Sequence, residues 1–192
     1  MFVSHNRDRL INAMIYFAGG TRIDNKSKLF RLLYLLDFAH FRRTGISVTG
    51  SDYSADHLGP VPIEVDRAWN DPASPLRQTI QFVKEVGRRH SIPDRTASRA
   101  FDESHFTPRQ LRILSDLADR YRDARHPDLT EVSEEDNAAY ARSWRDGEGE
   151  HQPIPYDLAI SDTDPHANEI REAAREARLL EQKTHPARGE SA

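Results

Sequence analysis

Residues 27–43 read SKLFRLLYLLDFAHFRR and predict the centre of the fold. Ten of these seventeen residues are Leu, Phe, Tyr or Ala, and at 100° per residue they fall on every side of a helix. Lys28 and Arg31 share one side, and Asp37 and His40 lie roughly opposite them. Such a helix rises about 25 Å and is too short and too charged to span a bilayer. The stretch therefore predicts a central core helix that neighbouring elements enclose.

The composition indicates one domain with a hydrophobic core. The chain has 192 residues, of which 37% are hydrophobic and 30% charged, and its mean hydropathy is −0.76. It contains no cysteine, which excludes disulfides, thiolate chemistry and a cysteine-ligated metal. The N-terminus has no signal-peptide pattern, and no apolar run is long enough to cross a membrane. We expect a soluble, cytoplasmic protein without a membrane partner.

Charge is distributed unevenly along the chain. Residues 1–50 hold eight Lys or Arg against three Asp or Glu, whereas residues 128–192 hold seven against sixteen. The acidic last third argues against contact with nucleic acid there and would suit a basic partner surface. A solvated acidic tail explains the same charge equally well.

Periodicity and turn residues predict the elements before residue 107. We expect the following: a helix over 5–18, a strand or tight loop within 46–59, a helix over 63–69, and a strand over 79–86 with a hairpin partner near 90–93. Ser4 and Asp24 are the expected N-caps of the first helix and of the central helix. Gly45 suits the left-handed position after the central helix.

The remainder of the chain predicts three more helices. Thr107-Pro108-Arg109-Gln110 is a strong helix start, with a capping Thr, a Pro at the first position and a Gln at the capping-box position. An acidic helix within 128–145 should end near Trp144, and an Ala-rich helix with a thin apolar seam should follow over about 165–182. The expected fold is mainly α (α+β): a helical domain around a central buried helix, with a small antiparallel sheet and a C-terminal helix.

No set of residues assembles a recognisable catalytic site. The chain has no G-x-S-x-G nucleophile elbow, no phosphate-binding loop and no H-E-x-x-H motif. Asp37 with His40, or Asp52 with Asp56 and His57, could ligate a metal, but no second paired site completes either sphere. We therefore expect no catalytic residue, no cofactor and no metal. A buried Asp37 would instead need a hydrogen-bond partner.

Nucleic-acid binding is the alternative from a second functional class. The basic first fifty residues could contact phosphates, with Arg42 and Arg43 as the most direct candidates. The sequence carries no helix-turn-helix, zinc-finger or ribonucleoprotein signature, and its pI is about 6.1. Cations at helix ends explain the same residues more simply, so nucleic acid is the less favoured partner.

Several motifs together resemble the Panacea domain of SocA-type antitoxins. Residues 28–37, KLFRLLYLLD, are similar to the K-L-x-K-L-L-Y helix of that family, and Gly59-Pro60-Val61-Pro62 is similar to its G-P-V loop. Asp52-Tyr53 before that loop and the helix opened by Phe106-Thr107 also resemble the family, although Gln110 stands where Glu is usual. The resemblance covers roughly residues 5–145.

One family element is not reproduced. A (T/S)-H-x-x-x-P-W element often follows the helix after Thr107 in the family, whereas here Glu134 stands in the His place and Trp144 is shifted. The resemblance nevertheless identifies a set of motif residues as candidates for partner binding. These are Tyr34, Asp37, Tyr53, Gly59, Pro60, Val61, Pro62 and Trp144.

The resemblance implies a non-catalytic antitoxin that is encoded beside a toxic partner and neutralises it by direct binding. Some relatives act as adaptors that hand the toxin to a protease, so a protease or chaperone stays open as a further partner, as does a second copy of this chain. We divide the chain into a Panacea-like domain, 1–146, and an acidic loop with a C-terminal helix, 147–192. The second part, outside the common domain, is hypothesised to contribute toxin specificity.

Overall fold

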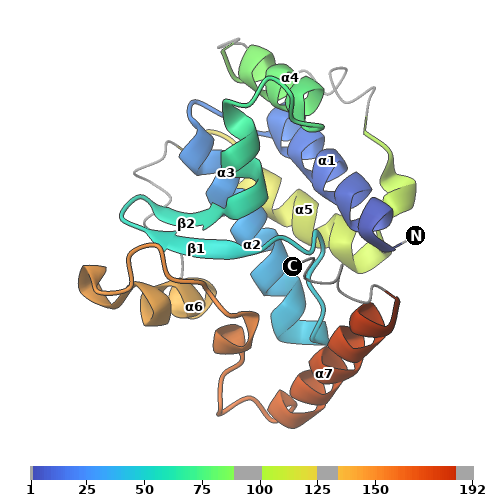
Figure 1. Ribbon diagram of the computed structural model, residues 1–192, viewed down its shortest axis with the longest axis vertical. Helices are drawn as coiled ribbons and strands as arrows, with labels where there is room; N and C mark the ends of the chain where they lie inside the picture. The colour runs from blue at the N-terminus through green and yellow to red at the C-terminus, as the bar shows by residue number, and fades with distance from the viewer. Residues whose placement is uncertain (1, 89–100, 125–133, 185–192) are drawn as a thin grey trace, which may run out of the picture.

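The computed structural model describes residues 2–88, 101–124 and 134–184 (Figure 1). The elements, in chain order, are α1 (Phe2–Gly20), α2 (Lys26–Thr44), β1 (Tyr53–Asp56), β2 (Gly59–Pro62), α3 (Ile63–Trp69), α4 (Arg77–Arg88), η2 (Glu103–His105), α5 (Pro108–Arg120), α6 (Glu134–Trp144), η4 (Arg145–Gly147), η5 (Tyr156–Ala159) and α7 (Ala167–Thr184). Helices dominate and β1 and β2 form a two-stranded antiparallel sheet, which confirms the mainly α prediction.

Helix α2 is the centre of the core, as the apolar pattern of 27–43 predicts. Thirteen of its nineteen residues are buried, and α1, α5, α6, α7 and β2 all contact it. Asn25 caps the helix by accepting a hydrogen bond from the backbone N–H of Lys28 at 3.0 Å, so the expected cap at Asp24 was wrong by one position. Gly45 ends it in the left-handed conformation at φ 72°, as expected.

The hairpin β1–β2 packs directly against α2 and lies at the left of Figure 1. Its register pairs Tyr53 with Pro62 and Asp56 with Gly59. The other edge of β1 is also covered, because the chain returns after α6 and exchanges backbone hydrogen bonds with Ala55. The N–H of His151 donates to the carbonyl of Ala55 at 2.7 Å, and the N–H of Ala55 donates to the carbonyl of Gln152 at 2.9 Å. Both edges of β1 are therefore paired.

Two expected elements differ from the structure. Residues 79–86 lie in helix α4 rather than in a strand, since Leu76, Ile80 and Val83 share one buried face at helical spacing against α1. The run of β-branched and aromatic residues favours a strand locally, and tertiary packing overrides that preference. The partner expected near 90–93 lies outside the described residues. Helix α1 begins at Phe2, so Ser4 lies inside it and does not cap it.

The later helices follow the sequence signals closely. Thr107 and Gln110 form the expected capping box of α5: the N–H of Thr107 donates to Oε1 of Gln110 at 2.9 Å, and the N–H of Gln110 donates to Oγ1 of Thr107 at 3.3 Å. Helix α6 ends at Trp144 and α7 covers the expected Ala-rich stretch.

Helix α7 packs against the C-terminal end of α2, at the lower right of Figure 1. Phe41, Ile160 and Ile170 form a small second core there with Ala167 and Ala174. Gly45 permits the close approach, because a Cβ at this position would lie 2.5 Å from the carbonyl oxygen of Ile170.

The connection between α6 and α7 also contributes to the main core. Ile154 is 3% exposed and Ala159 is 7% exposed, and both belong to the main cluster around α2. The division of the chain at residue 146 stays a prediction, but removal of everything after that residue would strip side chains from the core.

Candidate functional site

The buried carboxylate of Asp37 is the polar centre of the motif region. Its Oδ1 accepts hydrogen bonds from the backbone N–H of Val48 at 2.8 Å and of Thr49 at 2.7 Å. Its Oδ2 accepts from the hydroxyl of Thr49 at 2.5 Å and of Tyr53 at 2.8 Å. The expectation that a buried Asp37 needs a partner is thus met by four donors, three from the segment between α2 and β1 and one from Tyr53 at the start of β1. Asp37 fastens this segment to the central helix.

The Asp37 network is inaccessible to solvent, and burial dominates its electrostatics. Asp37 is 0% exposed, and burial raises its pKa although all four hydrogen bonds act to lower it. Burial also raises the pKa of the Tyr53 phenol well above its ordinary value, and the nearby Asp37 charge adds to this effect. A carboxylate that is enclosed and fully hydrogen-bonded serves as a structural anchor rather than as a ligand for an outside group.

Tyr156 completes this network and was not among the residues singled out from the sequence. Its ring stacks on Phe38 and Phe41, with centroids 4.5 Å and 5.0 Å apart, and its hydroxyl donates to the carbonyl of Ser51 at 2.6 Å. The same hydroxyl lies 3.4 Å from Oδ2 of Asp37. The sequence around Tyr156 has no periodicity that would mark it as a core residue.

Tyr34 and Gly59 join the hairpin and α6 to the central helix one turn before Asp37. The hydroxyl of Tyr34 accepts a hydrogen bond from the N–H of Tyr140 at 3.0 Å, and the Tyr140 hydroxyl donates to the carbonyl of Asp56 at 2.8 Å. Gly59 has φ 118°, and a Cβ there would lie 2.5 Å from Nη2 of Arg31. The glycine is therefore required both by the backbone conformation and by the guanidinium that lies against it.

The other motif residues have mainly structural positions. Pro60 and Pro62 are buried in β2, whereas Val61 is partly buried and packs at the edge of the core. Trp144 is partly buried at the end of α6, where its ring stacks on Tyr140 at 6.2 Å between centroids. The structure thus places Tyr34 and Trp144 against Tyr140, and the Arg31 guanidinium that lies against Gly59 is over the Tyr140 ring. The ring of Tyr34 also meets that of Tyr53 edge to face, with centroids 5.8 Å apart, so this group adjoins the Asp37 cluster.

A groove of about 740 Å³ lies beside the Asp37 cluster. Its floor is aromatic, with Phe41, Tyr53 and Tyr156, and its walls come from the segment after α2, from residues 153–157 and from α7. Ile46 lines the groove and is 47% exposed. Asp52 also lines the groove, and within the described part of the chain its carboxylate forms no ion pair.

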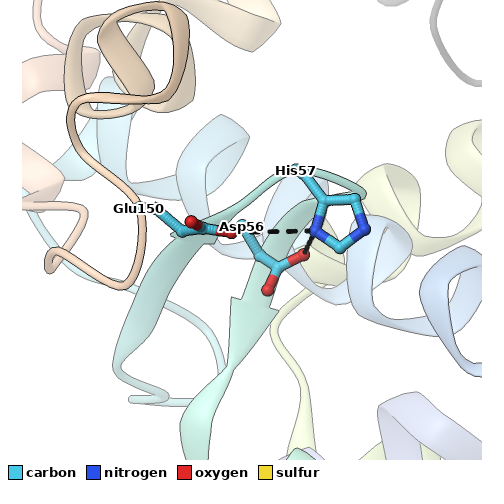
Figure 2. Close-up of side chains that lie close together, drawn as sticks. All are labelled: Asp56, His57 and Glu150. Carbon is cyan, nitrogen blue, oxygen red and sulfur yellow. Dashed lines mark ion pairs between the residues drawn. The ribbon is translucent and has the colours of Figure 1, made fainter.

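Neither of the two metal sites considered from the sequence forms with the expected set of residues. Asp37 bonds to the segment after α2, and Nδ1 of His40 lies 2.6 Å from the carbonyl of Ile46, so these two residues do not face a common point. Asp56 and His57 do lie together, but their neighbour is Glu150 rather than Asp52 (Figure 2). Sequence reasoning could not find Glu150, because it comes from the loop after α6.

Comparison of the sequence with known protein families finds a match, and it covers the motifs on α2 and the hairpin. The family model described as "Antitoxin SocA-like, Panacea domain" matches residues 29–139, which is more than half of the chain. The chain belongs to this family. The matched part of the Panacea domain includes Tyr34, Asp37, Tyr53 and the Gly59–Pro62 strand, whereas Trp144 and Tyr156 follow it.

No curated protein and no solved structure matches this Panacea-domain chain. Among the described residues, no helix is both long enough and apolar enough to cross a membrane.

Proposed function

We propose that this Panacea-domain protein is the antitoxin of a bacterial toxin–antitoxin pair, which acts in the cytoplasm without catalysing a reaction. It neutralises its cognate toxin by direct binding. The observation that carries the proposal is the antitoxin-family match over residues 29–139. The chemistry of the motif residues supports it, since the side chains of Tyr34 and Asp37 are buried and committed to internal hydrogen bonds. What such a domain offers a partner is therefore a surface rather than a reactive group.

The groove beside Tyr156 is the face that we assign to the toxin. A partner segment that inserts an apolar side chain against Tyr156 and Ile46 would cover apolar surface, and a Lys or Arg on that segment would meet the carboxylate of Asp52. Ile46 at 47% exposure extends this apolar surface to the outside. Anchor residues of this kind carry most of the binding energy in protein interfaces.

The hypothesis that residues 147–192 contribute toxin specificity gains support from the same groove. Pro153, Ile154, Pro155 and Tyr156 form part of its lining, and α7 adds Ala174 and Ala177. Point variants test this hypothesis better than truncation after Gly147, which would also remove Ile154 and Tyr156 from the core. A full-length variant with Ala177→Glu places a charge in the wall and leaves the core intact, because Ala177 is only partly buried.

The alternative of a nucleic-acid-binding regulator loses support in the structure. Arg7 pairs with Glu64, Lys26 with Asp66, and Arg42 with Asp136, so carboxylates from later in the chain neutralise much of the basic first fifty residues. Arg31 and Lys28 are buried. Little of this charge is left to contact phosphates.

The decisive experiment expresses the product of the neighbouring gene alone and together with this chain in a heterologous bacterium. We expect toxicity that this chain relieves and a complex that elutes as one species. Ile46→Glu should lose both effects, whereas Leu58→Glu should keep them, because Leu58 is 50% exposed on the hairpin turn and does not line the groove. Neutralisation that survives both substitutions would refute the assignment of the groove, and a neighbour that is harmless would refute the antitoxin proposal.

The same strains separate direct inhibition from delivery to a protease. In direct inhibition the toxin accumulates in complex with this chain. In the adaptor mode the toxin disappears on co-expression and is restored in a protease-deficient host. Both outcomes agree with neutralisation by direct binding, and toxin turnover decides between them.

A further inference from the structure

The tip of the β1–β2 hairpin meets the loop after α6, and three side chains of metal-ligating types gather where they meet. Asp56 and His57 come from the hairpin, and Glu150 comes from the loop (Figure 2). The donors therefore come from two segments that are far apart in the sequence.

Backbone contacts hold these two segments in place. The hydrogen bonds between His151, Gln152 and Ala55 pair the loop with β1. The N–H of Gly149 donates to the carbonyl of Trp144 at 3.0 Å, which anchors the loop to the end of α6. The backbone that carries the donor side chains is thus held in place on both segments.

The donor atoms are spaced as a small cation would need them. Nδ1 of His57 lies 2.8 Å from Oδ1 of Asp56 and 3.9 Å from Oε1 of Glu150, and the three donor atoms all lie within 4.8 Å of one another. Ligand atoms around tetrahedral zinc are about 3.3–3.5 Å apart, given metal–ligand distances near 2.0–2.2 Å. The observed spacings lie on either side of this value. His57 and Glu150 are 63% and 49% exposed in their side chains, so small rotations can bring them to it.

We propose that Asp56, His57 and Glu150 bind one Zn²⁺ ion. Solvent can complete the coordination, because the side chains of His57 and Glu150 are well exposed. One imidazole together with two carboxylates suits zinc better than magnesium, which prefers oxygen ligands and retains its water.

The ion would cross-link the hairpin to the loop that leads to Tyr156 and the groove wall. The hairpin belongs to the family-matched region, and the loop follows that region. A Zn²⁺ ion that binds the folded chain and not the unfolded chain would stabilise the folded state. The proposal does not depend on the antitoxin function. The simpler explanation of the same cluster is a surface ion pair between His57 and Asp56 that holds no metal.

Calorimetric titration of the chelator-treated full-length protein with ZnCl₂ tests the proposal. We expect one saturable site per chain, and at least a tenfold loss of affinity in both His57→Gln and Glu150→Gln. His166→Gln is the matched control, because the His166 side chain is 69% exposed and its Nδ1 lies 3.2 Å from Glu169, the one carboxylate that its ring pairs with among the residues that the structure describes. Its zinc affinity should equal that of the wild type.

Thermal unfolding with and without Zn²⁺ provides a second readout on the same proteins. The midpoint should rise with zinc in the wild type and in His166→Gln, and should stay unchanged in His57→Gln, whose midpoint without metal should match that of the wild type. Absence of one-to-one binding, or equal zinc affinity in all four proteins, would overturn the proposal and indicate adventitious binding to scattered histidines only.

Discussion

Replacement of Asp37 by Ala should destabilise the protein more than most core substitutions, because it removes the acceptor from four buried donors at once. The two backbone N–H groups, of Val48 and Thr49, have no other hydrogen-bond partner in the described structure. Each unsatisfied buried group costs about 1–3 kcal/mol. The hydroxyls of Thr49 and Tyr53 can rotate toward other acceptors, so we count the two N–H groups and expect a loss of about 2–6 kcal/mol in the free energy of unfolding.

Asp37→Asn separates the lost hydrogen bonds from the lost charge. The amide oxygen of Asn can accept from the N–H groups of Val48 and Thr49, and its NH₂ can donate to the hydroxyl oxygens of Thr49 and Tyr53. We therefore expect the Asn variant to lose only about 1 kcal/mol. Asp66→Ala is the control for a surface carboxylate, because the Lys26–Asp66 pair is 44% and 40% exposed and should be worth less than about 1 kcal/mol.

Urea unfolding followed by far-ultraviolet circular dichroism and by tryptophan fluorescence measures all three variants against the wild type. Trp69 and Trp144 lie in different parts of the fold, so coincident transitions also test two-state behaviour. If Asp37→Ala cost less than about 1 kcal/mol, the carboxylate would not be the attachment of the segment after α2 to the central helix. If the Asn and Ala variants were equally destabilised, the charge rather than the acceptor geometry would be responsible.

Three further predictions use the same unfolding measurement. Leu33→Ala should cost about 2–5 kcal/mol, since Leu33 is 0% exposed on α2, and a loss under about 1 kcal/mol would mean that α2 is not central. Gly59→Ala should lower the free energy of unfolding by about 2 kcal/mol or more, and by clearly more than Gly147→Ala does. Both glycines have positive φ, but only at Gly59 would the new Cβ meet Arg31. Equal losses in the two variants would contradict the role of that contact. The raised pKa of Asp37 means that, above about pH 4, the folded state binds more protons at this carboxyl than the unfolded state does. The wild type should therefore lose stability relative to Asp37→Asn as the pH rises from about 4 through the folded pKa. Parallel pH profiles of the two proteins over about pH 4–7 would contradict this.

Features of the fold that depend on neighbouring residues in the sequence could be predicted. The apolar residues of 27–43, the capping box of Thr107 with Gln110, and the left-handed Gly45 each specify their own local structure. The prediction failed at α4, where residues with strand preference lie on a helix whose buried face packs against α1. Such a face can be recognised only when its partner is known.

The candidate site depends on contacts between distant segments, so the sequence indicated only half of it. Asp37 was identified as a buried group in need of a partner, but its donors lie eleven to sixteen positions away, in the irregular segment after α2 and at the first residue of β1. Glu150 comes from the loop after α6 and Tyr156 from the first residue of η5, in a stretch whose sequence has no periodic pattern. Their positions follow from the pairing of residues 151–154 with β1, and no local signal predicts that pairing.

If this chain binds a toxin as proposed, the positions of the motif residues would let the same domain accommodate different partners. Tyr34 binds the backbone N–H of Tyr140, one residue beyond the family-matched region, and Asp37 lies against the hydroxyl of Tyr156. The motifs thus act inward and anchor a chain segment that follows the matched region, and this segment supplies part of the groove wall. Backbone and hydroxyl contacts of this kind constrain few of the neighbouring side chains. The exposed residues of the anchored segment could therefore change with the toxin while the motifs that hold it stay the same.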